Sequence, residues 1–579
     1  METDPQILAR AKKWLEGDFD KETQNQVKDL IANDPTGLTD AFYRDLEFGT
    51  GGLRGVMGVG TNRMNRYTVG MATQGLANYL KKSYPREKEL RMAIAYDSRN
   101  NSKLFATTAA EVLSANHIRV FLFEELRPTP VLSFAVRELS CHSGIVITAS
   151  HNPKEYNGYK VYWKDGGQLV APHDTNVIDE VQLIASIDDV KWSGDKALIE
   201  YIGKNIDDVY VERVKGLSLS PDAIARQKQM RIVYTPIHGT GITLVPRCLA
   251  EFGFENVSVV QAQATPDGNF PTVISPNPEE ADAMNLALIQ AKEQNADLVL
   301  ATDPDADRVG VAVKNQHGEF VLLNGNQTAS VLIYYLISKW KENGKLTGKE
   351  YIVKTIVTSE LLKDIALKNG VGCYDVLTGF KFIAEKILSL EGHKTFIGGG
   401  EESYGYLVGD FVRDKDAVIA CCMIAEAAVW AADRGKSFFE LLIEMYAEFG
   451  LYKEKLKSVT KKGKEGAEEI HAMMVSYRNS PPVKIAHQPV VEIRDYLLRK
   501  ITNLQQGTEK KIELPKSDVI QFFLVDGSKI TVRPSGTEPK IKFYFGVKAP
   551  LSGTEAFDKV NADLDHQVEQ IIKSLGLFS

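Results

Sequence analysis

Residues 91–153 read RMAIAYDSRNNSKLFATTAAEVLSANHIRVFLFEELRPTPVLSFAVRELSCHSGIVITASHNP, and this stretch decides the fold class. It contains three short apolar runs, Arg91–Tyr96, Arg119–Phe123 and Gly144–Thr148, which are separated by segments with apolar residues at helical spacing. Strands that alternate with helices are typical of βαβ units and a largely parallel sheet. The stretch therefore predicts an α/β fold.

The alternation of strands and helices recurs twice further along the chain. One run begins at Arg231 and ends in a predicted helix near Gln327–Lys341; another begins at Tyr351 and ends in a helix at Ala417–Ala432. After about Gly450, a charged segment leads to hairpin-like strands and a final helix, which is typical of an antiparallel α+β module. These changes, with helices predicted in the first forty residues, divide the chain into four domains, 1–224, 225–343, 344–450 and 451–579.

Composition narrows the class of protein. The 579 residues are too many for one hydrophobic core. A net charge of −7 supplies no basic field for nucleic acid, and the five cysteines have no metal-ligand spacing and fit reduced thiols. The amino terminus does not resemble a signal peptide, and the most apolar stretch is interrupted by Glu426 and too short for a bilayer. We expect a cytoplasmic protein without nucleic-acid or membrane partners.

The segment Thr148-Ala-Ser-His-Asn-Pro153 follows a predicted buried strand. The carboxyl ends of parallel strands are where α/β proteins bind ligands, so Ser150 is a candidate nucleophile. A hydrolase elbow is excluded because G-x-S-x-G is absent. On its own the segment also fits an ordinary surface turn. Lys160, ten residues further on, either returns to this loop or is a solvated lysine at a strand end.

The segment Asp303-Pro-Asp-Ala-Asp-Arg308 lies between two predicted strands. Three carboxylates at alternate positions repel one another unless a cation binds them, and oxygen ligands suit Mg²⁺. An EF-hand is excluded because Arg308 and Lys314 stand where that loop needs Gly and Glu. Three carboxylates leave an open coordination position, which a phosphoryl oxygen on Ser150 could fill.

Two later segments carry groups suited to hydroxyls and anions. In Gly400-Glu-Glu-Ser-Tyr-Gly405, Glu401 and Ser403 offer hydrogen-bonding groups to vicinal hydroxyls. In Arg533-Pro-Ser-Gly-Thr-Glu538, a guanidinium precedes hydroxyls and backbone N–H groups that can surround a phosphate. Each segment alone also fits a turn or a hairpin loop. Nucleotide-binding glycine motifs are absent.

These four segments, in this order, resemble the motifs of the α-D-phosphohexomutase family, and the resemblance covers essentially the whole chain. It implies four domains around a central cleft, three similar α/β domains and a C-terminal α+β domain that resembles the TATA-binding protein. It implies that Ser150 is a phosphoserine and that Mg²⁺ is held by Ser150, Asp303, Asp305 and Asp307.

The resemblance also implies roles for other residues. Glu401 and Ser403 would bind sugar hydroxyls, and Lys381 matches a lysine in a loop of the third domain. Lys160 matches the position proposed for general-base work, with His151 as the alternative base. The residues expected at the reacting phosphate are Arg54, His151 and Arg308. Those expected at the distal phosphate are Arg533, Ser535, Gly536 and Thr537.

The reaction implied is the interconversion of glucose 1-phosphate and glucose 6-phosphate through a phosphoserine enzyme and bound glucose 1,6-bisphosphate. The segment Gly400–Gly405 resembles the glucose-type signature, although mannose or pentose phosphates remain close alternatives as main substrates. An Mg²⁺-dependent sugar phosphatase and a non-catalytic sugar-phosphate sensor are more distant ones. The expected partners are small-molecule sugar phosphates, and the protein is expected to be a monomer or a homodimer.

Overall fold

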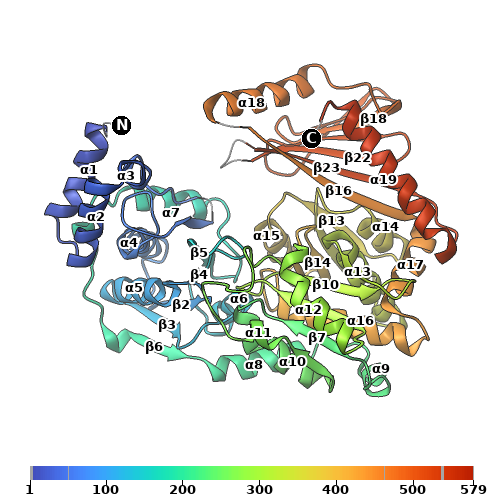
Figure 1. Cartoon of the computed structure of the whole chain (residues 1–579), viewed down its shortest axis with the longest axis horizontal. Helices are drawn as coiled ribbons and strands as arrows, with labels where there is room; N and C mark the ends of the chain where they lie inside the picture. Colours follow the sequence, from blue (N-terminus) through green and yellow to red (C-terminus); the bar gives the residue numbers. More distant parts are fainter. Residues whose placement is uncertain (1–3, 50, 462, 536–539, 578–579) are drawn as a thin grey trace.

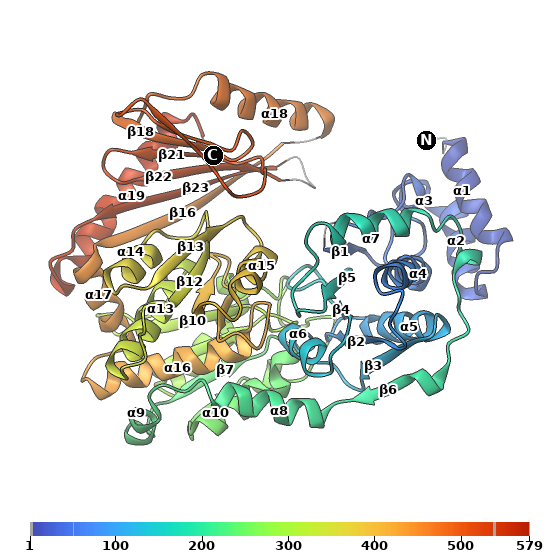
Figure 2. The same ribbon diagram turned by 180° about the vertical axis from the view of Figure 1, so that it is seen from behind.

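The computed structural model describes residues 4–49, 51–461, 463–535 and 540–577, whose strands form four sheets. Domains I to IV are named after these sheets in chain order. Domain I, in blue, lies beside domains II and III, and domain IV, in orange and red, lies against domain III (Figures 1 and 2). The predicted fold class, three α/β domains and a last sheet-rich domain, is confirmed.

Domain I contains a six-stranded sheet. Its strands are β1 (Gly52–Val56), β2 (Leu90–Tyr96), β3 (Ile118–Phe123), β4 (Ser143–Ile147), β5 (Tyr156–Trp163) and β6 (Ile199–Ile202). In the order β1-β5-β4-β2-β3-β6, the last four strands are parallel as predicted, while β5 and β1 run antiparallel at one edge. At this edge Gly52 lies opposite Lys160. Arg54 on β1 and Lys160 on β5, both predicted site residues, therefore lie on neighbouring strands.

The helices of domain I cover both faces of this sheet and include the predicted amino-terminal pair. They are α1 (Pro5–Glu16), α2 (Lys21–Asn33), α3 (Pro35–Phe42), α4 (Arg66–Ser83), α5 (Ser102–Ala115), α6 (Thr129–Glu138), α7 (His173–Gln182), α8 (Lys204–Lys215) and α9 (Pro221–Arg226), with short 3-10 turns η1 (Ile187–Asp189) and η2 (Lys196–Leu198). Trp14 of α1 stacks on Phe19 at a centroid distance of 4.4 Å and packs edge-on against Tyr67 of α4. These aromatic contacts attach the amino-terminal helices to the domain.

In domain II, the predicted metal-binding segment, residues 303–308, lies at the end of a hairpin. Its strands are β7 (Ile232–Thr235), β8 (Val257–Val259), β9 (Leu298–Thr302), β10 (Val309–Lys314) and β11 (Phe320–Leu323), and its helices are α10 (Val245–Phe252), α11 (Gln261–Ala264) and α12 (Ala281–Glu293), with the 3-10 turn η3 (Thr240–Thr243). Strands β8, β7 and β9 are parallel, and β10 returns antiparallel to β9 with Thr302 opposite Val309. Both hairpin strands are buried, which fixes the loop between them.

Domain III has a four-stranded sheet in the order β13-β12-β14-β15. Its elements are α13 (Gly325–Glu342), β12 (Glu350–Thr355), α14 (Leu361–Lys368), β13 (Gly372–Val376), α15 (Phe380–Leu390), β14 (Thr395–Gly400), β15 (Tyr406–Val408), α16 (Ala417–Asp433) and α17 (Phe438–Phe449). Strand β14 ends in three glycines, and a Cβ on Gly399 would lie 2.4 Å from the Val353 carbonyl oxygen. Glycine therefore allows β14 to pair closely with β12.

Helix α16 is the apolar segment predicted as a buried helix, and it is buried almost throughout. Its one buried carboxylate, Glu426, accepts hydrogen bonds from the Ser218 hydroxyl and from the backbone N–H groups of Leu219 and Ser220 at 3.0 and 2.8 Å. Glu426 thus anchors the segment that leads from domain I to domain II. Among the described residues, no helix has the length and hydropathy to cross a membrane.

Domain IV is an eight-stranded antiparallel sheet with two long helices. Its elements are β16 (Leu451–Thr460), α18 (Gly463–Asn479), β17 (Lys484–Ile485), β18 (Gln488–Asp495), β19 (Lys500–Asn503), β20 (Thr508–Lys511), β21 (Ile520–Leu524), β22 (Lys529–Pro534), β23 (Lys540–Ala549), the 3-10 turn η4 (Thr554–Ala556) and α19 (Phe557–Ser574). The pattern predicts β21, β22, β23 and α19, but indicates only a charged segment where β16 lies. Lys453 and Lys455 lie on this edge strand and pair with acidic side chains of α19. The charged residues of the predicted segment therefore belong to an edge strand.

Candidate active site

The serine loop, residues 148–153, leaves β4 at the carboxyl edge of the domain I sheet. Ser150 is 4% exposed and has a φ of 53°, in the left-handed region. Its backbone N–H donates to the Thr148 hydroxyl at 2.8 Å, and its Oγ lies 3.2 Å from the His151 Nδ1. The Ser150 Oγ also donates to the Asp303 Oδ2 at 2.7 Å. The predicted nucleophile and the predicted metal segment are therefore in direct contact.

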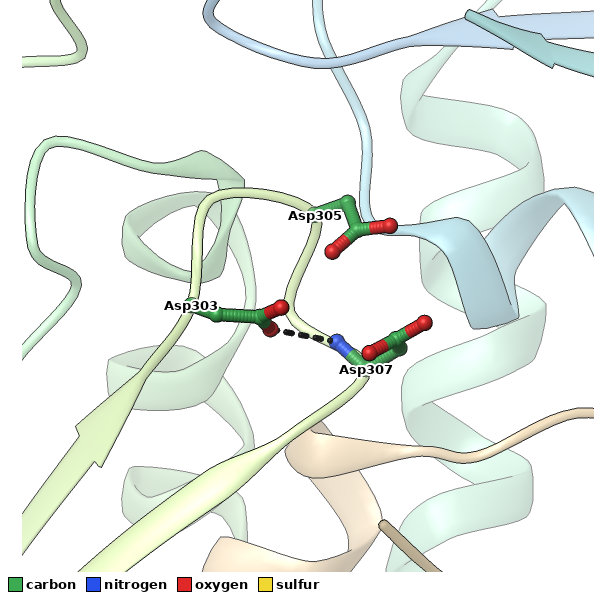
Figure 3. A group of neighbouring side chains, drawn as sticks. All are labelled: Asp303, Asp305 and Asp307. Atoms are coloured by element: carbon green, nitrogen blue, oxygen red, sulfur yellow. Dashed lines mark hydrogen bonds between the residues drawn. The ribbon is translucent and has the colours of Figure 1, made fainter. Parts of the chain in front are cut away.

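The metal loop, residues 303–308, brings its three carboxylates together, as Figure 3 shows. One ligand atom from each aspartate lies within 4.8 Å of the others, and all three side chains are buried. The Asp303 carboxylate accepts hydrogen bonds from the backbone N–H groups of Asp307 and Arg308 at 3.1 and 3.0 Å. The Oδ1 atoms of Asp305 and Asp307 are buried without a hydrogen-bond partner. Unpaired buried carboxylate oxygens fit a bound cation, so this group can hold a metal ion.

Two lysines partly balance the charge of the metal loop. The Lys160 Nζ lies 2.9 Å from the Asp305 Oδ2 and 3.3 Å from the Asp307 Oδ2. The Lys415 Nζ lies 3.2 Å from the same Asp307 oxygen. Lys160 is thus placed at the site from the middle of β5 rather than from a strand end. Lys415 was not predicted, although the charged run Arg413-Asp-Lys-Asp416 directly before the apolar helix α16 is a signal that sequence reasoning could have used.

The proton affinities of the aspartates reflect their different neighbours. Burial raises the pKa of Asp303, and the nearby Asp305 and Asp307 carboxylates raise it further. Burial, the largest single influence, would also raise the pKa of Asp305, but the charge and hydrogen bond of Lys160, a hydrogen bond with Asp303 and the charge of Lys415 together lower the pKa of Asp305. The Thr129 hydroxyl at the start of α6 donates to the Asp305 Oδ2 at 3.0 Å. Domain I thus contacts this loop through Thr129, Ser150 and Lys160.

The two predicted arginines both lie near His151 of the serine loop. The Arg308 guanidinium is held by Glu279 at 2.6 Å, a carboxylate that sequence reasoning missed. Arg54 lies on β1 and donates to the Asn152 side chain at 3.2 Å. Burial lowers the pKa of His151 to about 2, and repulsion from Arg308 and Arg54 contributes to the shift. The part of the site around His151 therefore carries positive charge from Arg308 and Arg54, next to the negatively charged metal loop.

A cavity of about 530 Å³ extends from His151 and Arg308 to domain IV. It is lined by groups from domains II, III and IV, including the predicted Glu401, Ser403 and Arg533. The Glu401 Oε1 accepts a hydrogen bond from the Gly379 N–H at 3.0 Å, and burial raises the pKa of Glu401 to about 7. The cavity size suits a small polar ligand. The cavity therefore brings His151 and Arg308 together with Glu401, Ser403 and Arg533.

Two predicted substrate-binding residues, Lys381 and Ser535, are not part of the lining of this cavity. Lys381, on α15, lies 3.6 Å from Asp174 of α7, so in this structure it bridges domains III and I. Ser535 follows Arg533 directly after β22, and the predicted Gly536 and Thr537 lie outside the described residues.

Comparison with known proteins identifies the class. Family models described as "Phosphoglucomutase/phosphomannomutase, alpha/beta/alpha domain" I, II and III match residues 45–187, 208–318 and 324–449. A phosphoglucomutase of Staphylococcus aureus (strain bovine RF122 / ET3-1) is 39% identical over 526 residues, which covers 90% of this chain and 93% of the relative. A phosphoglucomutase of Staphylococcus haemolyticus (strain JCSC1435) is 37% identical over the same shares of both chains.

Solved structures share the fold. The pp63/parafusin of Paramecium in an open form has a TM-score of 0.68 at 17% identity, with 92% of this chain and 96% of that chain covered. A phosphoglucomutase/phosphomannomutase family protein of Burkholderia thailandensis has a TM-score of 0.62 at 16% identity, with 91% and 97% covered. The fold and the paired serine and aspartate loops define a phosphoryl-transferring mutase. The chain belongs to the α-D-phosphohexomutase family, and the resemblance seen in its motifs is confirmed.

Proposed function

We propose that this protein interconverts glucose 1-phosphate and glucose 6-phosphate. The observation that carries the proposal is the 2.7 Å contact between the Ser150 Oγ and Asp303, next to His151 and Arg308, which line a cavity that also reaches Arg533. A nucleophile beside a carboxylate group that can hold a metal accounts for phosphoryl transfer, and a second, distant cation accounts for a substrate with two phosphate positions. The relatives named phosphoglucomutase support glucose as the sugar.

Asp303, Asp305 and Asp307 would hold Mg²⁺, together with an oxygen of the phosphoryl group on Ser150. When bound, the ion would neutralise charge that develops on the transferring phosphoryl group. The unpaired Oδ1 atoms of Asp305 and Asp307 support this assignment. Arg308 and Arg54 would contribute positive charge from the chain itself, fixed by their contacts with Glu279 and Asn152.

In the forward step, a sugar hydroxyl attacks phosphorus, the bond between phosphorus and the Ser150 Oγ breaks, and glucose 1,6-bisphosphate forms. The hydroxyl proton leaves to His151, whose ring is neutral because its pKa is lowered, or to Lys160 after its ammonium group has given up a proton, and a proton is returned to the released Ser150 Oγ. The bisphosphate then turns, and its other phosphate returns to Ser150. Glu401 and Ser403 would hold the sugar hydroxyls in both orientations, while Arg533, with Ser535, Gly536 and Thr537, would hold the phosphate that is not reacting. Lys381 would join them if domain III releases it from Asp174.

The test is conversion of glucose 1-phosphate to glucose 6-phosphate by the purified protein, with Mg²⁺ and a trace of glucose 1,6-bisphosphate. We expect conversion by the native protein, and loss of at least about three orders of magnitude in Ser150→Ala because the nucleophile is absent. Ser389→Ala, on the exposed side of α15, is the matched control and should retain full activity.

Parallel assays separate the alternatives. Higher kcat/KM with mannose 1-phosphate or ribose 1-phosphate would replace glucose as the main substrate. Release of inorganic phosphate as fast as substrate is consumed would instead indicate a phosphatase. Absence of turnover on all three sugars, with phosphate shown on Ser150 by intact mass, would overturn the proposal.

A further inference from the structure

Arg99 is a buried arginine outside the residues discussed so far that lies directly behind the serine loop. It follows β2, its side chain is fully buried, and it does not line the cavity. Its guanidinium contacts main-chain carbonyls of the serine loop and of the start of β5. It donates to the carbonyl oxygens of Ser150 at 2.6 Å, Pro153 at 2.8 Å and Tyr156 at 3.0 Å, and also to that of Asn152.

These contacts fix the backbone at the nucleophile and in the residues that follow it. Ser150 has a positive φ, which a residue with a Cβ adopts only when its surroundings hold it there. The Ser150 carbonyl is one of the groups that Arg99 binds, so the guanidinium acts directly on the strained residue. Because arginine presents its donors in a rigid planar fork, one side chain can bind several carbonyls whose spacing is fixed.

Arg99 is itself held from two domains. The Asp97 Oδ2 lies 3.5 Å from the Arg99 Nε, and the Asp97 Oδ1 accepts from the Arg99 N–H at 2.9 Å and the Ser102 hydroxyl at 2.7 Å. From domain II, the Phe270 ring lies 5.1 Å from the Arg99 Cζ.

The domain II loop approaches Arg99 closely through a glycine. A Cβ on Gly268 would lie 2.3 Å from the Asn100 N, and the Asn100 side chain donates to Asn269 at 3.0 Å. The same loop reaches the metal loop, since the Asp267 N–H donates to the His238 carbonyl and the Thr240 N–H donates to the Pro304 carbonyl. The guanidinium therefore binds the segment that carries the nucleophile and packs on a domain II loop that is linked, through residues 238–240, to the metal loop.

We propose that Arg99 is a positioning residue that holds the Ser150 Oγ in line with the metal loop during phosphoryl transfer. The inference rests on the proposed mutase function. Arg99 touches neither the cavity nor the three aspartates, so it acts through the serine loop. A displacement of a reacting atom by about 1 Å can lower a rate about a hundredfold, so the loss of these carbonyl contacts should appear in kcat.

The decisive variant is Arg99→Lys, which keeps the positive charge but replaces the fork with one ammonium group. We expect kcat for glucose 1-phosphate to fall by about thirtyfold to a hundredfold while KM stays within about twofold, because the sugar contacts lie in domains III and IV. Phosphorylation of Ser150 by glucose 1,6-bisphosphate, followed by intact mass, should slow by a similar factor. Arg119→Lys, a surface arginine of β3 that pairs with Glu200, is the matched control and should leave both rates unchanged.

A purely structural role would lower the melting temperature of Arg99→Lys without changing kcat per folded molecule, and that result would overturn the inference. If Arg99→Lys fails to fold, Asp97→Asn and Phe270→Leu disturb the two supports of the guanidinium instead. Each should lower kcat severalfold with KM unchanged, and unchanged kcat in both would also overturn the inference. Inactivity of the native protein on sugar phosphates would refute the proposed function, whereas an active native protein with a fully active Arg99→Lys would refute only the role of Arg99.

Discussion

At the residue scale, Ser150 and the three aspartates show how sequence-distant groups become one reactive unit. The Ser150 hydroxyl donates to Asp303, and the other two carboxylates keep one unpaired oxygen each. Buried unpaired carboxylate oxygens are costly, and this cost is removed when a cation binds. The carboxylate oxygens that could bind a cation therefore lie in the loop that the Ser150 hydroxyl contacts.

The first residue-scale prediction concerns the metal group. Asp307→Asn removes one carboxylate, so the Mg²⁺ concentration for half-maximal activity should rise by about tenfold or more. In the native protein, saturating Mg²⁺ should raise the melting temperature, because a ligand that binds only the folded state stabilises it. This rise should be much smaller in Asp307→Asn.

The control for this prediction is Asp282→Asn, on the exposed first turn of α12, which should match the native protein in both assays. An unchanged Mg²⁺ requirement and an unchanged thermal shift in Asp307→Asn would show that the metal does not bind at this loop.

At the scale of elements, two loops of the site are held in place by the buried strands β9, β10 and β14. The metal loop joins two fully paired buried strands, and the hydroxyl-binding loop follows a strand whose glycines allow close pairing with β12. Helix α16 acts differently, because its one buried carboxylate, Glu426, fixes the connection between domains I and II.

Glu426→Gln tests that connection. The amide keeps the shape of the carboxylate but offers one acceptor oxygen instead of two to the donors of residues 218–220. Loss of a charge-assisted acceptor for buried N–H groups should lower the free energy of unfolding by about 1–3 kcal/mol, measured by urea denaturation. Activity per folded molecule should not change, since Glu426 lies away from the cavity.

Glu293→Gln, at the exposed end of α12, provides the comparison and should leave stability within about 0.5 kcal/mol. Equal stability of the two variants would mean that Glu426 does not anchor the interdomain segment.

At the scale of the whole molecule, the cleft depends on domain IV. The Lys529 Nζ of β22 contacts Glu360 at 2.7 Å and the Thr358 carbonyl at 3.1 Å, so domain IV is attached to domain III near the cavity. Strand β22 then carries Arg533 to the cavity lining. One substrate can thus meet groups from domains II, III and IV together.

Arg533→Gln tests the distal anion site. Loss of a charge-assisted contact of about 1.5–3 kcal/mol should raise KM for glucose 1-phosphate by about tenfold to a hundredfold. The effect should be similar for glucose 6-phosphate, because each substrate presents a phosphate to the distal site in one orientation. Arg213→Gln, on the exposed face of α8, should leave KM unchanged. A phosphatase without a distal site would show no difference between the two variants.

The sequence by itself determined the elements with strong patterns and the identity of the reactive groups. Apolar runs such as Gly144–Thr148 predict buried strands because a strand covered on both faces needs continuous apolar residues, and β4 lies there. Three alternating aspartates predict a cation site because their repulsion allows little else, and the structure gathers them. Strand β16 was missed because an edge strand that pairs with α19 carries charges, which removes the apolar signal.

Only the tertiary structure decided which distant groups meet. Lys415 contacts Asp307, and Arg99 binds the serine loop, across long separations in the chain, so the local sequence pattern does not show which residues either one contacts. The structure likewise places Lys381 on Asp174. A motif indicates the chemistry that its own segment can supply. The distances that bring the segments into one site arise from the packing of the four domains. The periodicity of the sequence does not encode those distances.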